Sequence, residues 1–505
     1  MSESRSEIRW VLGLAILLAL GPKCLAADYI PVFAKVPEPR REMRAAWVAT
    51  VHNIDWPSKP GLSGSQQRAE LTELLNVAAE TGLNAVILQV RTECDALYPS
   101  KIEPWSFWLS GQMGRAPSDG YDPLAFAIQE AHRRGIELHA WFNPFRSSAT
   151  SRSTKSRDHI SRTHSSLMLP ADSMVFANPA SDYSQQRALA VIKDVVSRYA
   201  IDGVHLDDYF YPYPKAVNGR RVETFNDSKF YQAYRSGGGQ LDARSWRRSE
   251  MDSFIRDLYG TVKSTKRHVD VGISPFGIWR PGVPRTIEAG VDAYEHLAAD
   301  SRKWLREGWL DYFSPQLYWR ISPAKQSFTT LYNWWSGENV KKRHFFPGIA
   351  SSRVMSSTDR GRPASEMTNQ IEVTRKRPSP LGAGHLHWSI DAILTNQGGL
   401  RDRLRSTYAE VAIPPASPWL GSAAPSPAYV AVEPGENGGT MLYFKETSDA
   451  QWRLIQVREG RKWTTLRLLP ASIEGFPLKN TPDQISVRHV SATGMLSVPT
   501  VFKKR

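Results

Sequence analysis

The sequence contains very little cysteine. Only Cys24 and Cys94 occur among its 505 residues, and Cys24 falls within a segment that we expect to be removed. A single remaining thiol cannot form an intramolecular disulfide. The fold must therefore depend on a packed core. Cys94 has no evident histidine partner, so we interpret it as a small buried side chain rather than a nucleophile.

Long hydrophobic runs are also scarce. The clearest one, residues 11–20, follows two arginines and precedes small residues. Its length of about ten residues is too short to span a bilayer but suits a secretion signal. Residues 1–26 are therefore predicted to be a signal peptide, and the mature chain, without a transmembrane segment, to be exported to the periplasm or cell envelope. The Gly-Pro-Lys sequence before Cys24 is a poor lipidation motif, which disfavours a lipid anchor.

Negative charge is in short supply. The chain has 64 Lys and Arg against 50 Asp and Glu, a formal net charge of +14. A basic balance favours nucleic acid, an anionic polymer or a membrane surface as partner. No nucleic-acid motif is present, and export favours an acidic envelope polymer. The alternative that the charge serves only solubility stays open.

Eight segments have the composition of β-strands, and most are followed by an amphipathic helical pattern such as residues 67–81. Strands that alternate with helices indicate a parallel sheet, and eight repeats predict a closed (β/α)8 TIM barrel over residues 40–412. The predicted strands are residues 44–51, 84–92, 137–145, 203–212, 270–279, 310–319, 345–351 and 384–391.

The C-terminal part has a different pattern. Residues 413–427 are rich in proline, serine and alanine and are predicted to be a linker. Short alternating runs over residues 428–505 predict a small all-β sandwich of the immunoglobulin or fibronectin III type. We expect this module to be separable and to serve binding or docking. Cell-division or envelope proteins are its candidate partners.

The segment GVHLDDYFYP (203–212) carries the strongest chemical signal. It ends in two adjacent carboxylates, Asp207 and Asp208, followed by aromatic rings. Neighbouring acids that are partly buried raise each other's pKa, which suits a proton donor at neutral pH. Alternate strand residues face the lumen of a barrel, so the carboxyl ends of other strands should bring further polar side chains to the same place.

Glycoside hydrolysis needs one protonated and one ionised carboxyl group. We predict Asp208 as the general acid and Asp207 as the ionised partner, braced by Arg91 or His205, although the two acids could exchange roles. Glu93 is the third catalytic candidate. Either Glu93 or Asp95, the acids after the second strand, could be the second catalytic carboxylate. The side chains predicted to bind substrate are Arg91, Asp95, Asn143, Arg146, His205, Tyr209, Gln316, Tyr318 and Trp388.

Two alternatives remain. His205, Asp207, His385 and His387 could form a zinc site for sugar deacetylation if all four face the lumen. No His-x-x-x-His or comparable ligand pair occurs, so neither a metal nor another cofactor is predicted. A barrel that binds glycan without cleaving it is the second alternative.

Six long segments carry a family resemblance. They are REMRAAWVATVHNIDWP (41–57), QVRTECDALYPSKIEPWSFWLSG (89–111), GYDPLAFAIQEAHRRGIELHAWFNPFR (120–146), DGVHLDDYFYPYP (202–214), DYFSPQLYW (311–319) and IPPASPWL (413–420). They resemble the bacterial glycosyl-hydrolase-like family 10, which includes divisome-localized glycosyl hydrolases acting on peptidoglycan. The resemblance implies a (β/α)8 barrel and an exported enzyme that cleaves peptidoglycan glycan strands lacking stem peptides.

Overall fold

The computed structural model describes residues 29–149, 154–376 and 382–505. The predicted signal peptide, including Cys24, lies outside the described residues. In the part of the chain that is described, no helix is long and apolar enough to cross a membrane.

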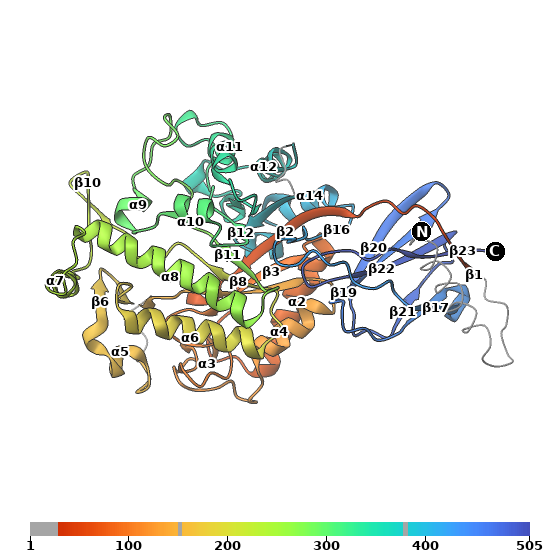
Figure 1. Cartoon of the computed structure of the whole chain (residues 1–505), viewed down its shortest axis with the longest axis horizontal. Coiled ribbons are helices and arrows are strands. Elements are labelled where there is room, and N and C mark those ends of the chain that lie inside the picture. The colour runs from red at the N-terminus through yellow and green to blue at the C-terminus, as the bar shows by residue number, and fades with distance from the viewer. Residues whose placement is uncertain (1–28, 150–153, 377–381) are drawn as a thin grey trace, which may run out of the picture.

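A parallel sheet forms the centre of the larger domain (Figure 1), with the strand order β13-β12-β11-β8-β4-β3-β2-β15-β14. Its two outermost strands are consecutive pieces of one segment, separated only by Phe346 and Pro347. The sheet therefore closes on itself, which confirms the predicted barrel. Its strands are β2 (Arg40–Val48), β3 (Ala85–Arg91), β4 (Glu137–Phe142), β8 (Gly203–Leu206), β11 (Asp270–Ile273), β12 (Tyr312–Phe313), β13 (His344–Phe345), β14 (Gly348–Ile349) and β15 (Ala383–His387).

Helices connect successive strands and cover the outside of the barrel. The first starts before the predicted residue 67, because Ser63 and Gln66 form a capping box at its N-terminus. It ends at Gly82, whose φ of 91° is in the left-handed region that favours glycine. The main helices are α2 (Gly64–Thr81), α4 (Pro123–His132), α6 (Asp182–Arg198), α8 (Ala243–Thr265), α10 (Ser301–Glu307), α11 (Phe328–Glu338), α12 (Ala364–Lys376) and α14 (Leu400–Thr407).

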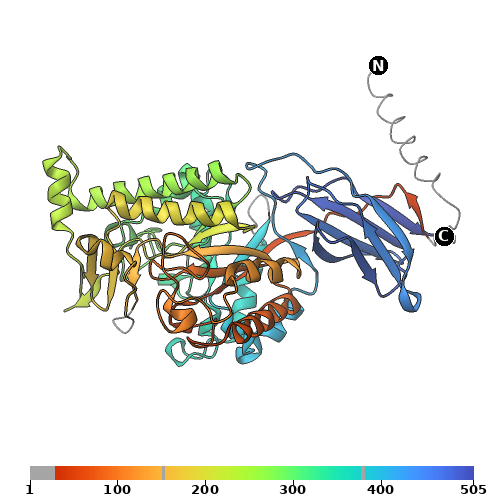
Figure 2. The ribbon, with the colours of Figure 1, turned by 90° about the horizontal axis from the view of Figure 1, so that it is seen from below.

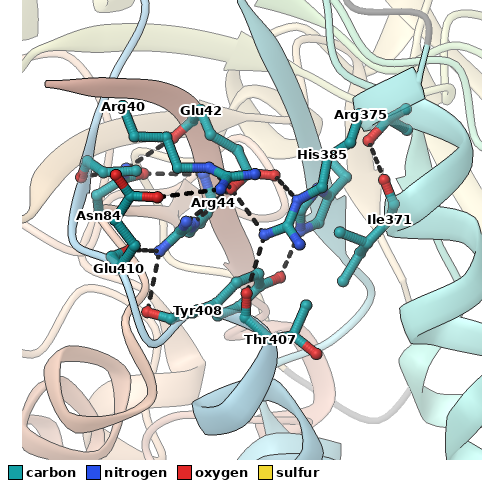
Figure 3. A network of polar contacts seen from close by, with 12 residues as sticks. Arg40, Glu42, Arg44, Asn84, Ile371, Arg375, His385, Thr407, Tyr408 and Glu410 are labelled. Carbon is teal, nitrogen blue, oxygen red and sulfur yellow. Dashed lines mark hydrogen bonds and ion pairs between the residues drawn. The ribbon is translucent and has the colours of Figure 1, made fainter. Parts of the chain in front are cut away.

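A buried charged network joins the first strand to two of these helices (Figure 3). Glu42 of β2 accepts hydrogen bonds from Arg44 Nε at 2.8 Å and from Arg375 Nε of α12 at 2.7 Å. Arg375 Nη2 also donates to the carbonyl of Thr407, at the end of α14, at 3.0 Å. The carboxylate of Glu42 is fully buried. Glu42 therefore holds the start of β2 against α12, and Arg375 extends this network to the end of α14.

The smaller domain is a sandwich of antiparallel sheets, as predicted, but it uses both ends of the described chain. The N-terminal strand β1 pairs with β23, the last strand, with Tyr29 opposite Lys504. A five-stranded sheet contains β1 (Tyr29–Val32), β23 (Thr500–Lys504), β22 (Gln484–Val490), β19 (Trp452–Glu459) and β20 (Lys462–Pro470), and a three-stranded sheet contains β17 (Val430–Pro434), β18 (Thr440–Phe444) and β21 (Gly475–Leu478).

The sandwich packs against the amino ends of the barrel strands (Figure 2). Arg41, near the start of β2, donates to the carbonyl of Gly494 at 2.7 Å. The ring of Trp452 lies 5.0 Å from that of His132, just before β4. The predicted linker begins with β16 (Ala412–Ile413), which pairs with β2. The carboxyl ends of the strands are left free for chemistry.

Two long insertions lie at those carboxyl ends, away from the sandwich (Figures 1 and 2). The insertion after β4 folds as a three-stranded sheet in the order β5-β7-β6, and the one after β8 folds as a hairpin and a helix. Their elements are β5 (Arg146–Ser148), β6 (Met168–Ala171), β7 (Met174–Ala177), β9 (Lys215–Val217), β10 (Arg220–Val222) and α7 (Ser228–Ser236).

Candidate active site

Asp207 follows β8 and lies against Asn143, which follows the neighbouring strand β4. Asp207 Oδ2 accepts a hydrogen bond from Asn143 Nδ2 at 2.5 Å. The orientation of the Asn143 amide is set by Gln89 Nε2, which donates to Asn143 Oδ1 at 2.5 Å, and by Arg146 Nη2, which donates to the same oxygen at 2.9 Å. Three adjacent strands thus hold Asp207 through side chains, as expected for groups at the carboxyl end of a barrel.

Asp208 has a different set of partners. Its Oδ2 accepts a hydrogen bond from the hydroxyl of Tyr213, five residues further along the chain. Gln316, from the segment after β12, also stabilises its ionised form. Both acids of the pair are at least nine-tenths buried, with exposures of 5% for Asp207 and 7% for Asp208.

Burial and mutual repulsion move the titration of this pair toward neutral pH. Burial, and then the neighbouring Asp208, raise the pKa of Asp207 to about 7, although Arg146 and Asn143 oppose the rise. Burial also raises the pKa of Asp208, but the hydroxyl of Tyr213 opposes it by favouring the carboxylate. This favours a proton on Asp207 and a charge on Asp208, the exchanged assignment that the sequence left open.

The charge of Arg146 acts on both acids of the pair. Its Nε donates to the carbonyl of Thr92 at 3.0 Å, and its guanidinium lies 5.1 Å from the centre of the Tyr209 ring. Its charge lowers the pKa of each acid of the pair relative to an unpaired buried carboxyl group. Arg146 therefore limits how much the pair costs in electrostatic free energy.

The predicted bracing of Asp207 by Arg91 or His205 is wrong. Arg91 forms a two-point ion pair with Glu103, at 2.7 and 2.6 Å. The pairing of β3 with β4 is irregular between Gln89 and Arg91, so simple alternation fails just before the strand ends.

His205 faces the lumen, but both nitrogens of its ring contact other buried side chains. Its Nδ1 lies 2.9 Å from the hydroxyl of Tyr312, and its Nε2 lies 2.8 Å from Ser274 Oγ. Burial lowers its pKa well below the usual value, so the ring is neutral and cannot supply charge to Asp207.

Glu93 and Asp95, the acidic residues after β3, form hydrogen bonds with loop residues. Asp95 Oδ1 accepts hydrogen bonds from the backbone nitrogens of Thr92 and Glu93, both at 2.8 Å, and so closes a turn. Glu93 is fully buried; its Oε1 accepts from the backbone nitrogen of Ala149, and Lys155 Nζ lies 3.5 Å away. Glu93 Oε2 has no hydrogen-bond partner among the described residues, and burial raises the pKa of this carboxyl group.

Aromatic side chains surround the same end of the barrel. The ring of Trp388 lies 6.0 Å from those of Trp47 and Trp141, and it stays partly exposed. Burial and the two acids raise the pKa of Tyr318 well above its usual value, which places its hydroxyl in their field. A side-chain carbon at Gly348 would approach the Trp47 ring to 2.9 Å, so glycine is needed there. A partly exposed ring such as that of Trp388 can pack against the apolar faces of sugars.

The eighth strand has the opposite orientation from the one we predicted. Leu386 belongs to the apolar cluster in the lumen with Trp47. His385 and His387 instead contact the hydroxyl of Tyr408, next to α14, and the His387 distance is 2.9 Å. The four residues of the alternative zinc site are therefore not brought together. In the described part of the chain, no group of three or more His, Cys, Asp or Glu side chains is arranged to hold a metal ion.

Two site residues were missed by sequence reasoning. Tyr213 lies beyond the predicted strand, and no local pattern links it to Asp208. Asp55 follows β2; its Oδ1 accepts from Ser389 Oγ at 2.6 Å and its Oδ2 from the backbone nitrogen of Ala49 at 2.7 Å. Burial raises the pKa of Asp55 to about 6. The position of Asp55, an acidic residue soon after the first barrel strand, is the sequence signal that could have identified it.

A closed barrel with a buried pair of acids at its carboxyl end has the architecture of a glycoside hydrolase. The chain belongs to the glycosyl hydrolase-like 10 family, whose model matches residues 42–363. It is 36% identical over 443 residues to glycosyl hydrolase YngK of Bacillus subtilis (strain 168), covering 84% of each chain. It is 35% identical over 334 residues to glycosyl hydrolase DigH of Escherichia coli (strain K12), covering 62% of this chain and 74% of DigH.

Solved structures are similar at a lower level. The PgaB (BpsB) glycoside hydrolase domain from Bordetella bronchiseptica has a TM-score of 0.49 and 12% identity, covering 73% of this chain and 99% of that domain. The endo-β-1,4-mannanase from Thermotoga petrophila has a TM-score of 0.43 and 10% identity, covering 92% of this chain and 98% of the mannanase. The fold assignment rests on the sheet topology described above.

Proposed function

We propose that this protein is an exported glycosidase that cleaves the glycan strands of peptidoglycan lacking stem peptides. The buried Asp207–Asp208 pair carries the proposal, because the pKa of Asp207 is raised to about 7 and leaves a proton donor available near neutral pH. The net charge of +14 supports an anionic polymer as substrate. Family membership supports glycosidic bonds as the target.

In the proposed reaction, Asp207 donates its proton to the glycosidic oxygen as the bond to the leaving sugar breaks. Asp208, kept ionised by Tyr213, stabilises the positive charge that develops on the sugar ring. Tyr209, Tyr318 and Trp388 contact the sugars and exclude bulk water from the acid pair. One water molecule then forms a bond to the anomeric carbon through its oxygen and gives a proton to Asp207, which restores the acid.

The test uses purified glycan strands from which stem peptides have been removed. The mature protein should release soluble fragments, and mass spectrometry of their ends identifies the bond that is cut. Asp207→Asn and Asp208→Asn should fold normally and lose about two to four orders of magnitude in rate. A protein that sediments with the strands but releases no fragments would instead be a non-catalytic glycan-binding barrel.

A further inference from the structure

The two insertions at the carboxyl end of the barrel form one unit, which we call the mouth lobe (residues 146–149, 154–181 and 213–240). Lys215 Nζ of one insertion lies 2.7 Å from Asp172 Oδ1 of the other. Lys229 Nζ donates to the carbonyl of Ser166 at 2.5 Å. The two segments lie close together in both views of the ribbon (Figures 1 and 2).

The mouth lobe begins at the acid pair. Tyr213, which donates to Asp208, lies two residues before the hairpin β9–β10 begins at Lys215. Thr224, which follows the hairpin, donates a hydrogen bond from its Oγ1 to the carbonyl of Tyr213 at 3.2 Å. On the other side, Arg146 opens the first insertion while contacting Asn143. A polymer bound at the acid pair would therefore extend over this lobe.

Most of the lobe's acidic side chains are paired, either within the lobe or with α8. Asp172 pairs with Lys215, while Glu223 and Asp227 both pair with Arg247 of α8. Of the lobe's acids that the structure describes, only Asp158 has no basic partner. Six exposed cations have no carboxylate partner within the described ranges: Arg157, Arg162, Arg220, Arg221, Lys229 and Arg235.

We propose that the mouth lobe is a binding surface for an anionic polysaccharide, and that it selects glycan strands with free carboxylates. The inference rests on the proposed function and names the part of the substrate that is recognised. Removal of a stem peptide leaves a free lactyl carboxylate on each muramic acid. Exposed cations attract such a chain over about a Debye length of 8 Å at physiological salt. Continuity of the lobe with the acid pair favours this occupant over an unrelated anionic partner.

The test removes three of the cations whose side chains form no hydrogen bond within the described chain, in the variant Arg162→Gln/Arg220→Gln/Arg235→Gln. The matched control is Arg461→Gln/Lys462→Gln/Lys479→Gln, which removes the same charge from exposed positions of the sandwich. Binding to peptide-free glycan strands is measured by sedimentation, and cleavage by fragment release. Each assay is repeated on strands whose carboxylates have been converted to methylamides.

The lobe variant should bind unmodified strands about tenfold more weakly, with the loss in KM rather than kcat, since three exposed charge pairs are lost. The difference should disappear on methylamide strands and in 1 M salt, whereas the control should match the natural protein throughout. Equal binding of methylamide and unmodified strands by the natural protein, or an equal loss in the control, overturns the inference. Loss of binding to phosphatidylglycerol vesicles, with glycan binding unchanged, overturns it in favour of a lipid surface. If neither the natural protein nor either variant releases fragments, the proposed function is wrong. The sedimentation assay still tests whether the mouth lobe binds the free carboxylates.

Discussion

At the residue scale, the hydroxyl of Tyr213 favours the charged form of Asp208. Tyr213→Phe removes the hydrogen bond to Asp208 without creating space. The pKa of Asp208 should rise, and kcat/KM at pH 7 should fall about tenfold or more, because a hydrogen bond to a charged group is lost. The acidic limb of the pH–rate profile should move to higher pH.

Tyr211→Phe is the matched control for that experiment. The hydroxyl of Tyr211 is buried and has no hydrogen-bond partner in the described chain, so its loss should not change the profile. An unaltered profile in Tyr213→Phe would mean that Tyr213 has no influence on the charge of Asp208.

Asp207 should be required in its protonated form. Since its pKa is raised to about 7, kcat/KM should fall as the pH rises above about 7. In Asp208→Asn this limb should move to lower pH, because the repulsion that helps to raise the pKa of Asp207 is removed. Measuring kcat/KM from pH 5 to 9 tests both statements. A rate that keeps rising above pH 8 would contradict them.

The same shift predicts that the site is less stable when it is ionised. A carboxyl group whose pKa is raised in the folded state favours folding below its unfolded pKa, and this contribution is lost as the pH rises through the folded value. Asp207→Asn cannot ionise, so at pH 8 it should be more stable than the natural protein by about 1 kcal/mol or more. Urea unfolding at pH 8 and pH 5.5 measures the difference, which should be smaller at pH 5.5.

At the element scale, the network around Glu42 (Figure 3) fastens β2 to α12 and α14. Glu42→Gln leaves Arg44 buried without a charged partner and leaves Arg375 paired only with the exposed Glu372, so it should cost about 3 kcal/mol of unfolding free energy in urea. Glu410→Gln is the control: the acid it removes pairs with Arg40, has a side chain 64% exposed, and should cost less than about 0.5 kcal/mol.

Acid should weaken this network. Burial opposes the ionisation of Glu42, but Arg375 and Arg44 overcome it and hold its pKa at about 2. Stability from a depressed carboxyl pKa is present above the unfolded value near 4.5 and is lost as the pH falls toward 2. The destabilisation caused by Glu42→Gln should therefore be largest near neutral pH and shrink below pH 4.

The elements also show where sequence patterns were sufficient. Eight repeats of strand and helix predicted the barrel, because each unit carries its own local pattern. Arg91 was placed wrongly because an irregular pairing in β3 shifts the side chains near the strand end. His385 and His387 were placed wrongly because both faces of β15 are buried, so alternation alone does not say which face is the lumen. Asp207, by contrast, ends a strand whose inward positions were identified correctly.

At the scale of the whole molecule, the sandwich should be removable if the cut respects the packing. A chain of residues 40–421 keeps Trp419, whose Nε1 donates to Asp311 Oδ1 at 2.7 Å, and should cleave short soluble glycans. Charged groups of the barrel that the sandwich contacts, such as Arg41, can be solvated by water once the sandwich is removed. A chain of residues 40–407 loses Tyr408, which is 4% exposed and bonded to His387, and should unfold at a lower temperature. Equal activity and melting temperature in both chains would contradict this boundary.

The pairing of β1 with β23 has a consequence for the order of folding. Tyr29–Val32 are synthesised about 470 residues before Thr500–Lys504. At translation rates of about 5–20 residues per second, the first strand waits roughly half a minute to a minute and a half for its partner. During this interval the barrel can form, but the sandwich lacks the strand to which β1 pairs. The nascent chain therefore carries β1 unpaired until Thr500–Lys504 have been synthesised.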